Sequence, residues 1–269
     1  FSHVSLVWTA VCVSFCCCFL FSFSVHCQTW QLVTEPYPPY FINNQSEPGW
    51  LHEVIIAALK SQKHQATIEY THWARALKLA KRHKRVAVLG AFYTEQRARE
   101  FSYSQPLATA HTVLFKQAGK DITFTGSLYS LKPYTISKGE DYVVSDEFEQ
   151  HAELTITTTD SLIESLLLLK HGRVDLVAGT KEVALYWLDK SERLQQAKQT
   201  ELEIISPYLA TQYLHVITKK DHPHAELFQQ SLYLGVQSLK NSGKLDEILK
   251  SYELSAEEIA SIHQLLAKH

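Results

Sequence analysis

Short β-rich runs alternate with helical patterns from about residue 28 to the end of this 269-residue chain, and this alternation constrains the fold more than any other feature. Apolar and β-branched runs predict strands at residues 30–34, 86–89, 112–115, 174–178 and 214–218. Apolar residues at helical spacing predict helices at about 51–63, 74–83, 162–171, 223–242 and 256–266. The chain is therefore predicted to be an α/β protein.

Polar residues mark the beginnings of two of these helices. Ser161 with Glu164, and Ser255 with Glu258, have the spacing of a capping box, in which each side chain bonds the other residue's backbone N–H. Gly172 follows the helix that begins after Ser161 and is predicted to end it before the next strand. These signals set the limits of two α/β units.

The N-terminal segment is predicted to direct export. Residues 4–25 contain no charged side chain and are strongly apolar. The segment is longer than the usual signal-peptide core of about 7–15 residues and reaches the roughly 18–20 residues of a spanning helix. Residues 1–27 are therefore interpreted as a cleaved signal peptide, with a retained membrane anchor as the alternative. Neither an initiator Met nor a basic stretch precedes the segment, which leaves the true N-terminus open.

Charge and cysteine content exclude several classes of function. Lys and Arg number 26 against 28 Asp and Glu, so the chain has no basic excess for binding a nucleic-acid backbone. All five cysteines lie within residues 1–27. A product that begins near residue 28 would therefore have no disulfide and no thiol nucleophile, which suits an oxidising compartment such as the periplasm.

The chain lacks the short motifs of common enzyme classes, such as GxSxG, HExxH, GxxxxGK[ST] and GxGxxG. His222 and His224 flank a proline where a helix begins, and we interpret them as solvated residues rather than metal ligands. The basic residues from Arg75 to Arg85 are interspersed with alanine and leucine, which is typical of the solvated face of an amphipathic helix. We therefore predict no enzyme activity, no cofactor and no metal.

Two loops that follow predicted strands carry candidate binding residues. Residues 34–41 place Tyr37 and Tyr40 on a proline-stiffened loop, where the rings serve equally well to hold a ligand or to cover the edge of the core. Residues 90–97 follow a buried strand, so they lie at the sheet edge where open α/β folds bind ligands. Arg97 in that loop has a two-donor fork that matches a carboxylate.

Taken in order, several segments resemble the family-three bacterial extracellular solute-binding proteins, the periplasmic receptors of polar amino-acid ABC importers. The resemblance covers nearly the whole chain after residue 28, and each segment is short. The segments that carry it are residues 34–40, 48–50 with Glu53, 73–76, 94–97, 103–106, 172–175 and 239–245 with Ile248 and Tyr252.

This resemblance implies a two-lobed fold of the type II periplasmic-binding-protein class, in which each lobe is a mixed sheet flanked by helices. The implied lobes are residues 28–116 with 214–269, and residues 117–213. The two crossing strands of the hinge are expected at residues 112–116 and 214–219. A small polar solute is the expected ligand and an ABC permease the expected partner, with no nucleic acid, no membrane contact after cleavage, and a monomeric periplasmic protein.

The resemblance also implies which residues bind the solute. Arg97, the arginine of a Thr-x-x-Arg motif, is expected to bind its carboxylate, while Tyr40 and other aromatic residues pack against its body. The expected ligand-binding residues are Tyr40, Trp73, Gly90, Phe92, Thr94, Arg97 and Thr180.

One departure from the family pattern affects the expected solute. Amino-acid-binding members often have an acid shortly after the strand that begins at residue 174, but here the sequence is Ala178-Gly179-Thr180. Carboxylates without an α-amino group are therefore expected to bind at least as well as amino acids. If amino acids alone bind, the partner of their ammonium group lies elsewhere, and Glu140 and Asp141 are the first candidates.

Two other functions remain open. One is a dehydratase or related lyase on the same scaffold, for which Glu35, Glu140 and Asp141 are the candidate acids or bases. The other is a sensor domain tethered to the membrane by an uncleaved N-terminal helix.

Overall fold

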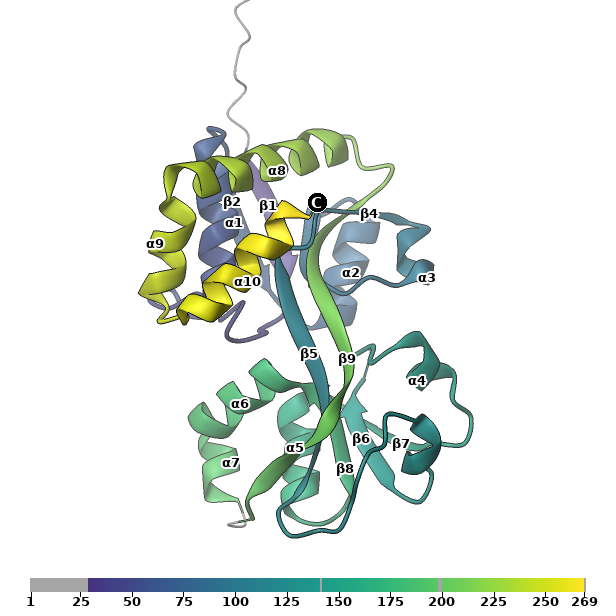
Figure 1. The fold of residues 1–269 in the computed structure, drawn as a ribbon. Coiled ribbons are helices and arrows are strands. Elements are labelled where there is room, and N and C mark those ends of the chain that lie inside the picture. The colour runs from purple at the N-terminus through teal and green to yellow at the C-terminus, as the bar shows by residue number, and fades with distance from the viewer. Residues whose placement is uncertain (1–28, 141, 198–199, 269) are drawn as a thin grey trace, which may run out of the picture.

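The computed structural model describes residues 29–140, 142–197 and 200–268, and it has two lobes joined by two long strands (Figure 1). The predicted leader, residues 1–27, and the candidate acid Asp141 lie outside the described residues. In the described part of the chain, nine strands are paired in the order β2-β1-β3-β9-β5-β8-β6-β7, with β4 also paired to β9. This mixed arrangement confirms the predicted α/β class.

The first lobe is built around a sheet made from both ends of the described chain. Its strands are β1 (Thr29–Thr34), β2 (Gln65–Tyr70), β3 (Ala87–Ala91), β4 (Phe101–Tyr103) and the last part of β9 (Leu202–Lys219). β1 pairs in parallel with β2 and β3, whereas β9 is antiparallel to β3 and β4. The predicted strand at 214–218 therefore belongs to this lobe.

The second lobe has its own five-strand arrangement. Its strands are β6 (Thr135–Gly139), β7 (Thr155–Thr159), β8 (Leu176–Thr180), β5 (Ala108–Gln117) and the first part of β9. β6 pairs in parallel with β7 and β8, and β5 is antiparallel to β8 and β9. The long strands β5 and β9 thus take part in both lobes (Figure 1).

Helices cover both faces of each sheet. Those of the first lobe are α1 (Trp50–Ser61), α2 (Trp73–Lys81), α3 (Glu95–Ala98), α8 (Ala225–Ser242), α9 (Lys244–Ser251) and α10 (Ala256–Ala267). Those of the second lobe are the 3₁₀ helix η1 (Leu128–Leu131), α4 (Asp146–Gln150), α5 (Leu162–Lys170), α6 (Lys181–Lys190) and α7 (Glu192–Gln196).

Alternation along the strands explains why each sheet is covered on two faces. In β1, Leu32 packs in the core with α1 and α8, while the next residue, Val33, packs with Ala76 and Ala80 of α2. Successive side chains of a strand point to opposite faces, so a fully apolar strand requires helices on both sides. α2 buries these two alanines, and its lysines and arginine stay exposed, as predicted for a solvated helix face.

Three local expectations need correction. Residues 112–115 pair with β8 inside the second lobe, and residues 215–219 pair with β3 and β4 inside the first. The segments of β5 and β9 that pair only with each other, and so cross between the lobes, are therefore about residues 108–111 and 211–214. The strand predicted at 174–178 is β8, which begins two residues later. The boundaries predicted for the lobes, 28–116 with 214–269 and 117–213, remain a prediction.

The third correction concerns one of the two capping boxes. Ser255 and Glu258 form both bonds of the box at the start of α10. At α5, Ser161 accepts a bond from the Glu164 N–H at 3.3 Å, but the Glu164 carboxylate bonds Arg193 at 2.7 Å instead of returning to Ser161. The Arg193 guanidinium on α7 therefore replaces the Ser161 backbone N–H as the partner of the Glu164 carboxylate.

Three histidines that lose part of their contact with water make the stability of this fold depend on pH: His64 is buried, and His52 and His222 are partly buried, which corrects the interpretation of His222 as solvated. Burial lowers the pKa of His52, His64 and His222 below the ordinary value of 6.5. His64 packs edge-on against Trp30, with ring centroids 5.4 Å apart, and its Nε2 lies 3.2 Å from the Ser231 hydroxyl. The unfolded chain takes up protons first as the pH falls below 6.5, so acidification favours unfolding.

We predict that the free energy of unfolding falls between pH 7.5 and pH 5, and that His64→Gln makes this fall smaller because one of the buried groups no longer titrates. Urea unfolding at several pH values measures the effect. His171→Gln is the matched control, since the His171 residue is exposed. An unchanged pH dependence in His64→Gln would show that this histidine does not contribute.

Candidate functional site

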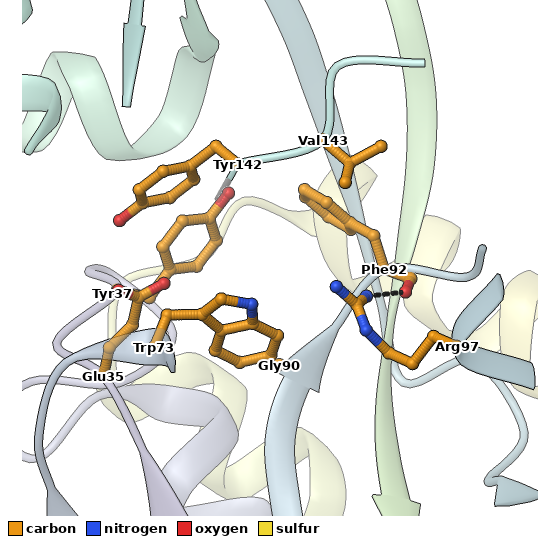
Figure 2. A pocket seen from close by; sticks show the side chains of 8 residues that line it. All are labelled: Glu35, Tyr37, Trp73, Gly90, Phe92, Arg97, Tyr142 and Val143. Atoms are coloured by element: carbon orange, nitrogen blue, oxygen red, sulfur yellow. Dashed lines mark hydrogen bonds between the residues drawn. The ribbon is translucent and has the colours of Figure 1, made fainter. Parts of the chain in front are cut away.

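The candidate site is a pocket between the lobes, close to the linking strands. It is lined by Glu35, Tyr37, Trp73, Gly90, Phe92, Arg97, Tyr142 and Val143 (Figure 2). Its volume is about 30 Å³, which leaves room for about two water molecules. The two lobes contact each other at this pocket, where Tyr37 meets Tyr142 and Thr180, and a larger solute requires these contacts to change.

The first lobe supplies one wall of the pocket from the ends of its strands. Gly90, in β3, has a φ of +78°, and a Cβ there would come within 3.0 Å of the Phe41 ring. A side chain at this position would therefore strain the backbone and crowd the loop beneath the pocket. Thr94 begins α3, and its hydroxyl accepts a bond from the Arg97 N–H at 3.1 Å. This cap fixes the backbone from which Arg97 projects.

The Arg97 guanidinium is the cation of the pocket. Its Nη1 donates to the Phe92 carbonyl at 2.6 Å, and the guanidinium carbon lies 5.4 Å from the centre of the Trp73 ring (Figure 2). Burial raises the pKa of the nearby Tyr103, and the charge of Arg97 opposes that rise. The Trp73 ring and the Phe92 carbonyl hold the guanidinium in place. A guanidinium has five N–H donors, and the bond to Phe92 uses one of them.

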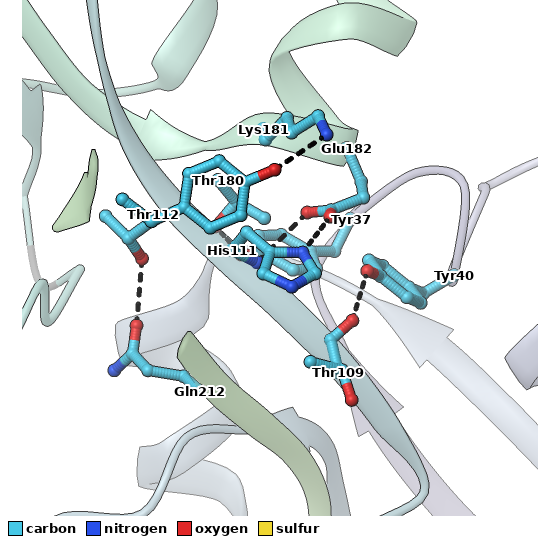
Figure 3. Close-up of polar contacts among 10 residues, drawn as sticks. Tyr37, Tyr40, Thr109, His111, Thr112, Thr180, Lys181, Glu182 and Gln212 are labelled. Carbon is cyan, nitrogen blue, oxygen red and sulfur yellow. Dashed lines mark hydrogen bonds and ion pairs between the residues drawn. The ribbon is translucent and has the colours of Figure 1, made fainter. Parts of the chain in front are cut away.

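The second lobe closes the pocket with aromatic contacts. The ring of Tyr142 stacks on that of Tyr37, with centroids 6.3 Å apart and planes 24° from parallel. The Tyr37 hydroxyl also bonds the hydroxyl of Thr180, at the end of β8 (Figure 3). Burial raises the pKa of Tyr37 and of Tyr142, and the charge of Glu35 adds to the rise in both. Both phenols are therefore neutral hydrogen-bonding groups.

The residues predicted from sequence fall into four positions. Trp73, Gly90, Phe92 and Arg97 line the same pocket. Thr180 lines an adjoining cavity of about 20 Å³, and Thr94 lines a cavity of about 780 Å³ at the outer side of Arg97. Tyr40 lies behind the pocket, where its ring stacks on Tyr37 and its hydroxyl donates to the Thr109 carbonyl at 2.9 Å (Figure 3).

The structure adds lining residues that the sequence did not indicate as ligand contacts. Tyr142 and Val143 follow β6 in a segment without periodic spacing, so no sequence signal marks them. Glu35 was a candidate only for an enzyme, yet it lines the pocket on the side away from Arg97 (Figure 2). Of the other two candidate acids, Glu140 is exposed and Asp141 is not described.

A further acid, Glu182, lies two residues after Thr180, but its carboxylate already bonds His111. Glu182, in the first turn of α6, has one carboxylate oxygen 2.7 Å from His111 Nδ1 and accepts the His111 backbone N–H at 3.2 Å (Figure 3). Both contacts lie on β5, in the segment that crosses between the lobes. Glu182 therefore ties α6 to the linking strand.

The family to which the chain belongs follows from its sequence. The pattern of the bacterial extracellular solute-binding proteins, family 3, matches residues 31–255. The chain belongs to this family, which confirms the resemblance described above. No curated protein sequence matched the chain.

Solved structures support the same fold. A histidine kinase sensor domain with similarity to periplasmic binding proteins is 18% identical with a TM-score of 0.72, and covers 83% of this chain and 95% of its own. The ligand-binding core of GluR0 from Nostoc punctiforme, in complex with L-glutamate, is 16% identical (TM-score 0.67; 82% and 98% covered). A periplasmic binding protein of the arginine third transport system from Legionella pneumophila is 14% identical (TM-score 0.68; 84% and 99% covered).

These structures share the predicted two-lobed, type II periplasmic-binding-protein fold, which is thereby confirmed. Among the residues described here, no helix has the length and apolar character needed to cross a membrane.

The bond between Tyr37 and Thr180 is a direct polar link between the lobes. We predict that Thr180→Val lets the lobes move apart, because it leaves the buried Tyr37 hydroxyl without this partner at a cost of about 1–3 kcal/mol. Small-angle X-ray scattering should show a larger radius of gyration for Thr180→Val than for the parent chain. Thr180→Ser keeps the hydroxyl and is the control. Equal radii in all three proteins would contradict the prediction.

Proposed function

We propose that the chain is an exported receptor that encloses a small carboxylate-bearing zwitterion, such as an amino acid, between its lobes and delivers it to an ABC permease. The observation that carries this proposal is the pocket itself, in which Arg97 and Glu35 lie on different sides of a group of aromatic rings (Figure 2). Membership of a solute-binding family and the arginine- and glutamate-binding proteins of similar fold support it.

Arg97 is proposed to bind the carboxylate of the solute. Its bond to Phe92 occupies one N–H, which leaves donors that can bond both oxygens of a carboxylate. The Trp73 ring against the guanidinium limits its rotation, so less side-chain entropy is lost when the solute binds. Phe92 and Tyr37 line the space beside it and would contact the apolar part of the solute.

Arg97→Lys is predicted to weaken solute binding by about ten- to a hundredfold, because an ammonium group cannot reproduce a two-bond fork and each bond to a charged partner is worth about 1.5–3 kcal/mol. Isothermal titration calorimetry with a solute found by screening measures the change. Arg99→Lys, at the exposed end of α3, is the matched control. Equal affinity in Arg97→Lys and the parent chain would remove Arg97 from the site.

Glu35 is proposed to meet the ammonium group of the solute. Thr180 remains a proposed contact, but its hydroxyl already bonds Tyr37, and a hydroxyl does not neutralise a buried cation. The sequence alone favours carboxylates without an α-amino group, whereas a carboxylate in the pocket favours solutes that carry both charges.

A thermal-shift screen of matched pairs, such as L-glutamate with glutarate, separates these two solute classes. We predict that Glu35→Gln reduces the shift given by the amine-bearing member and leaves that of its amine-free partner nearly unchanged, because only the first places a cation beside residue 35. If the parent chain responds to amine-free carboxylates alone, the ammonium role of Glu35 is wrong and the expectation based on Thr180 is right.

A sensory role is the second candidate, because a histidine kinase sensor domain has a TM-score of 0.72 to this chain. Binding and closure are the same in both roles, and only the partner differs. We favour a non-catalytic, monomeric periplasmic protein in transport, since the family and the structures named above are binding proteins. Loss of uptake of the identified solute on gene deletion supports transport. Retained uptake with a lost transcriptional response supports sensing.

A further inference from the structure

Tyr142 lines four neighbouring spaces between the lobes. It lines the pocket of about 30 Å³ and the adjoining cavity of about 20 Å³. It also lines two wider cavities, of about 780 Å³ and about 360 Å³. The first of these is lined by Arg97 as well, whereas the second is not, so the Tyr142 side chain forms part of the wall between the small inner site and the cavity of about 360 Å³.

Three contacts hold this wall in place. A Cβ on Gly139 would overlap the ring carbons of Tyr142, so the absence of a side chain at Gly139 makes room for the ring. The ring also stacks on Tyr37. The hydroxyl lies beside Glu35, and burial, followed by this negative charge, raises the pKa of Tyr142. The ring is thus supported by both lobes.

The 360 Å³ cavity beyond Tyr142 has a definite chemical character. Its described lining residues include the acids Glu35 and Asp160 and the aromatic Tyr70 and Trp187, and no lysine or arginine. Carboxylates and aromatic rings both attract organic cations. This cavity would therefore accept the cationic end of a long solute, but the Tyr142 ring stands between it and the pocket that contains Arg97.

We propose that Tyr142 sets the length limit of the solute, so that the site selects compact zwitterions and excludes those with a long cationic side chain. This inference rests on the proposed function, in which Arg97 holds the solute carboxylate. Removal of the ring would join the inner pocket to the cavity beyond it, and a longer cationic chain could then reach Asp160. The residue is therefore assigned a role in specificity, distinct from the charge recognition by Arg97 and Glu35.

The test uses amino acids that share one head group and differ in the length of a cationic side chain: L-2,3-diaminopropionate, L-ornithine and L-arginine. Dissociation constants are measured by calorimetry for the parent chain, Tyr142→Phe and Tyr142→Ala. We expect the parent chain to prefer the short member. Tyr142→Ala should shift the ratio of affinities toward L-arginine by about tenfold or more, a change of the size that one methylene group can produce in a closed pocket.

Tyr142→Phe keeps the ring and loses only the hydroxyl, so it should retain the preference of the parent chain. Gly139→Ala is a second variant, since its new methyl group would displace the ring and should shift the ratio in the same direction as Tyr142→Ala. Circular dichroism establishes that each variant is folded.

The outcomes separate this inference from the function on which it rests. If the parent chain binds the panel but the ratio is the same in Tyr142→Ala, or if it already prefers L-arginine, the length limit is wrong while the receptor function stands. If Tyr142→Phe shifts the ratio as far as Tyr142→Ala, the hydroxyl rather than the ring sets the preference among the solutes, and the proposal that the ring limits solute length is wrong. If no member binds any of the proteins, the zwitterion site is rejected and the length limit with it.

Discussion

The antiparallel pairing of β5 with β9 is the interaction on which the rest of the structure depends. The pairing runs from Ala108 opposite Leu214 to Gln117 opposite Leu202, with one irregularity between Thr112 and Leu114. The same two strands then pair with β8 in one lobe and with β3 and β4 in the other. Because one ladder serves both sheets, the lobes can change their angle but cannot separate. The site lies beside this ladder, so a change of angle moves its two walls less than it moves the outer rims of the lobes.

Contacts between neutral groups join the two lobes at the pocket. Tyr37 of the first lobe contacts Tyr142 and Thr180 of the second. Arg97 bonds the Phe92 carbonyl within its own lobe, and the charge of Glu35 acts on Tyr142 across the pocket. A solute therefore competes with contacts that the protein makes to itself, and its binding energy is the difference between the two sets.

The sequence predicted the parts of this molecule that have strong local signals. Periodic apolar spacing identified α1 and α8. The strand-end position of Arg97 and the family resemblance of the segment with Trp73 pointed to two residues that line one pocket. β7 was missed because Thr155–Thr159 is polar and largely exposed, without the apolar alternation of a half-buried strand. Tyr142 was missed because its role depends on Glu35 and Tyr37, which the fold brings to it from a segment about 100 residues away. Propensity and spacing contain no information on such contacts.

The division of β9 between two sheets has a consequence for the order in which the chain can fold. The second lobe contains a contiguous stretch of chain, and its sheet is complete once the first part of β9 is present. The first lobe begins earlier, but β3 lacks its antiparallel neighbour, and α1 its packing partner α8, until the last quarter of the chain is available. During synthesis, the second lobe can therefore reach its final structure before the first lobe, whose sheet and helices need the C-terminal segments of the chain.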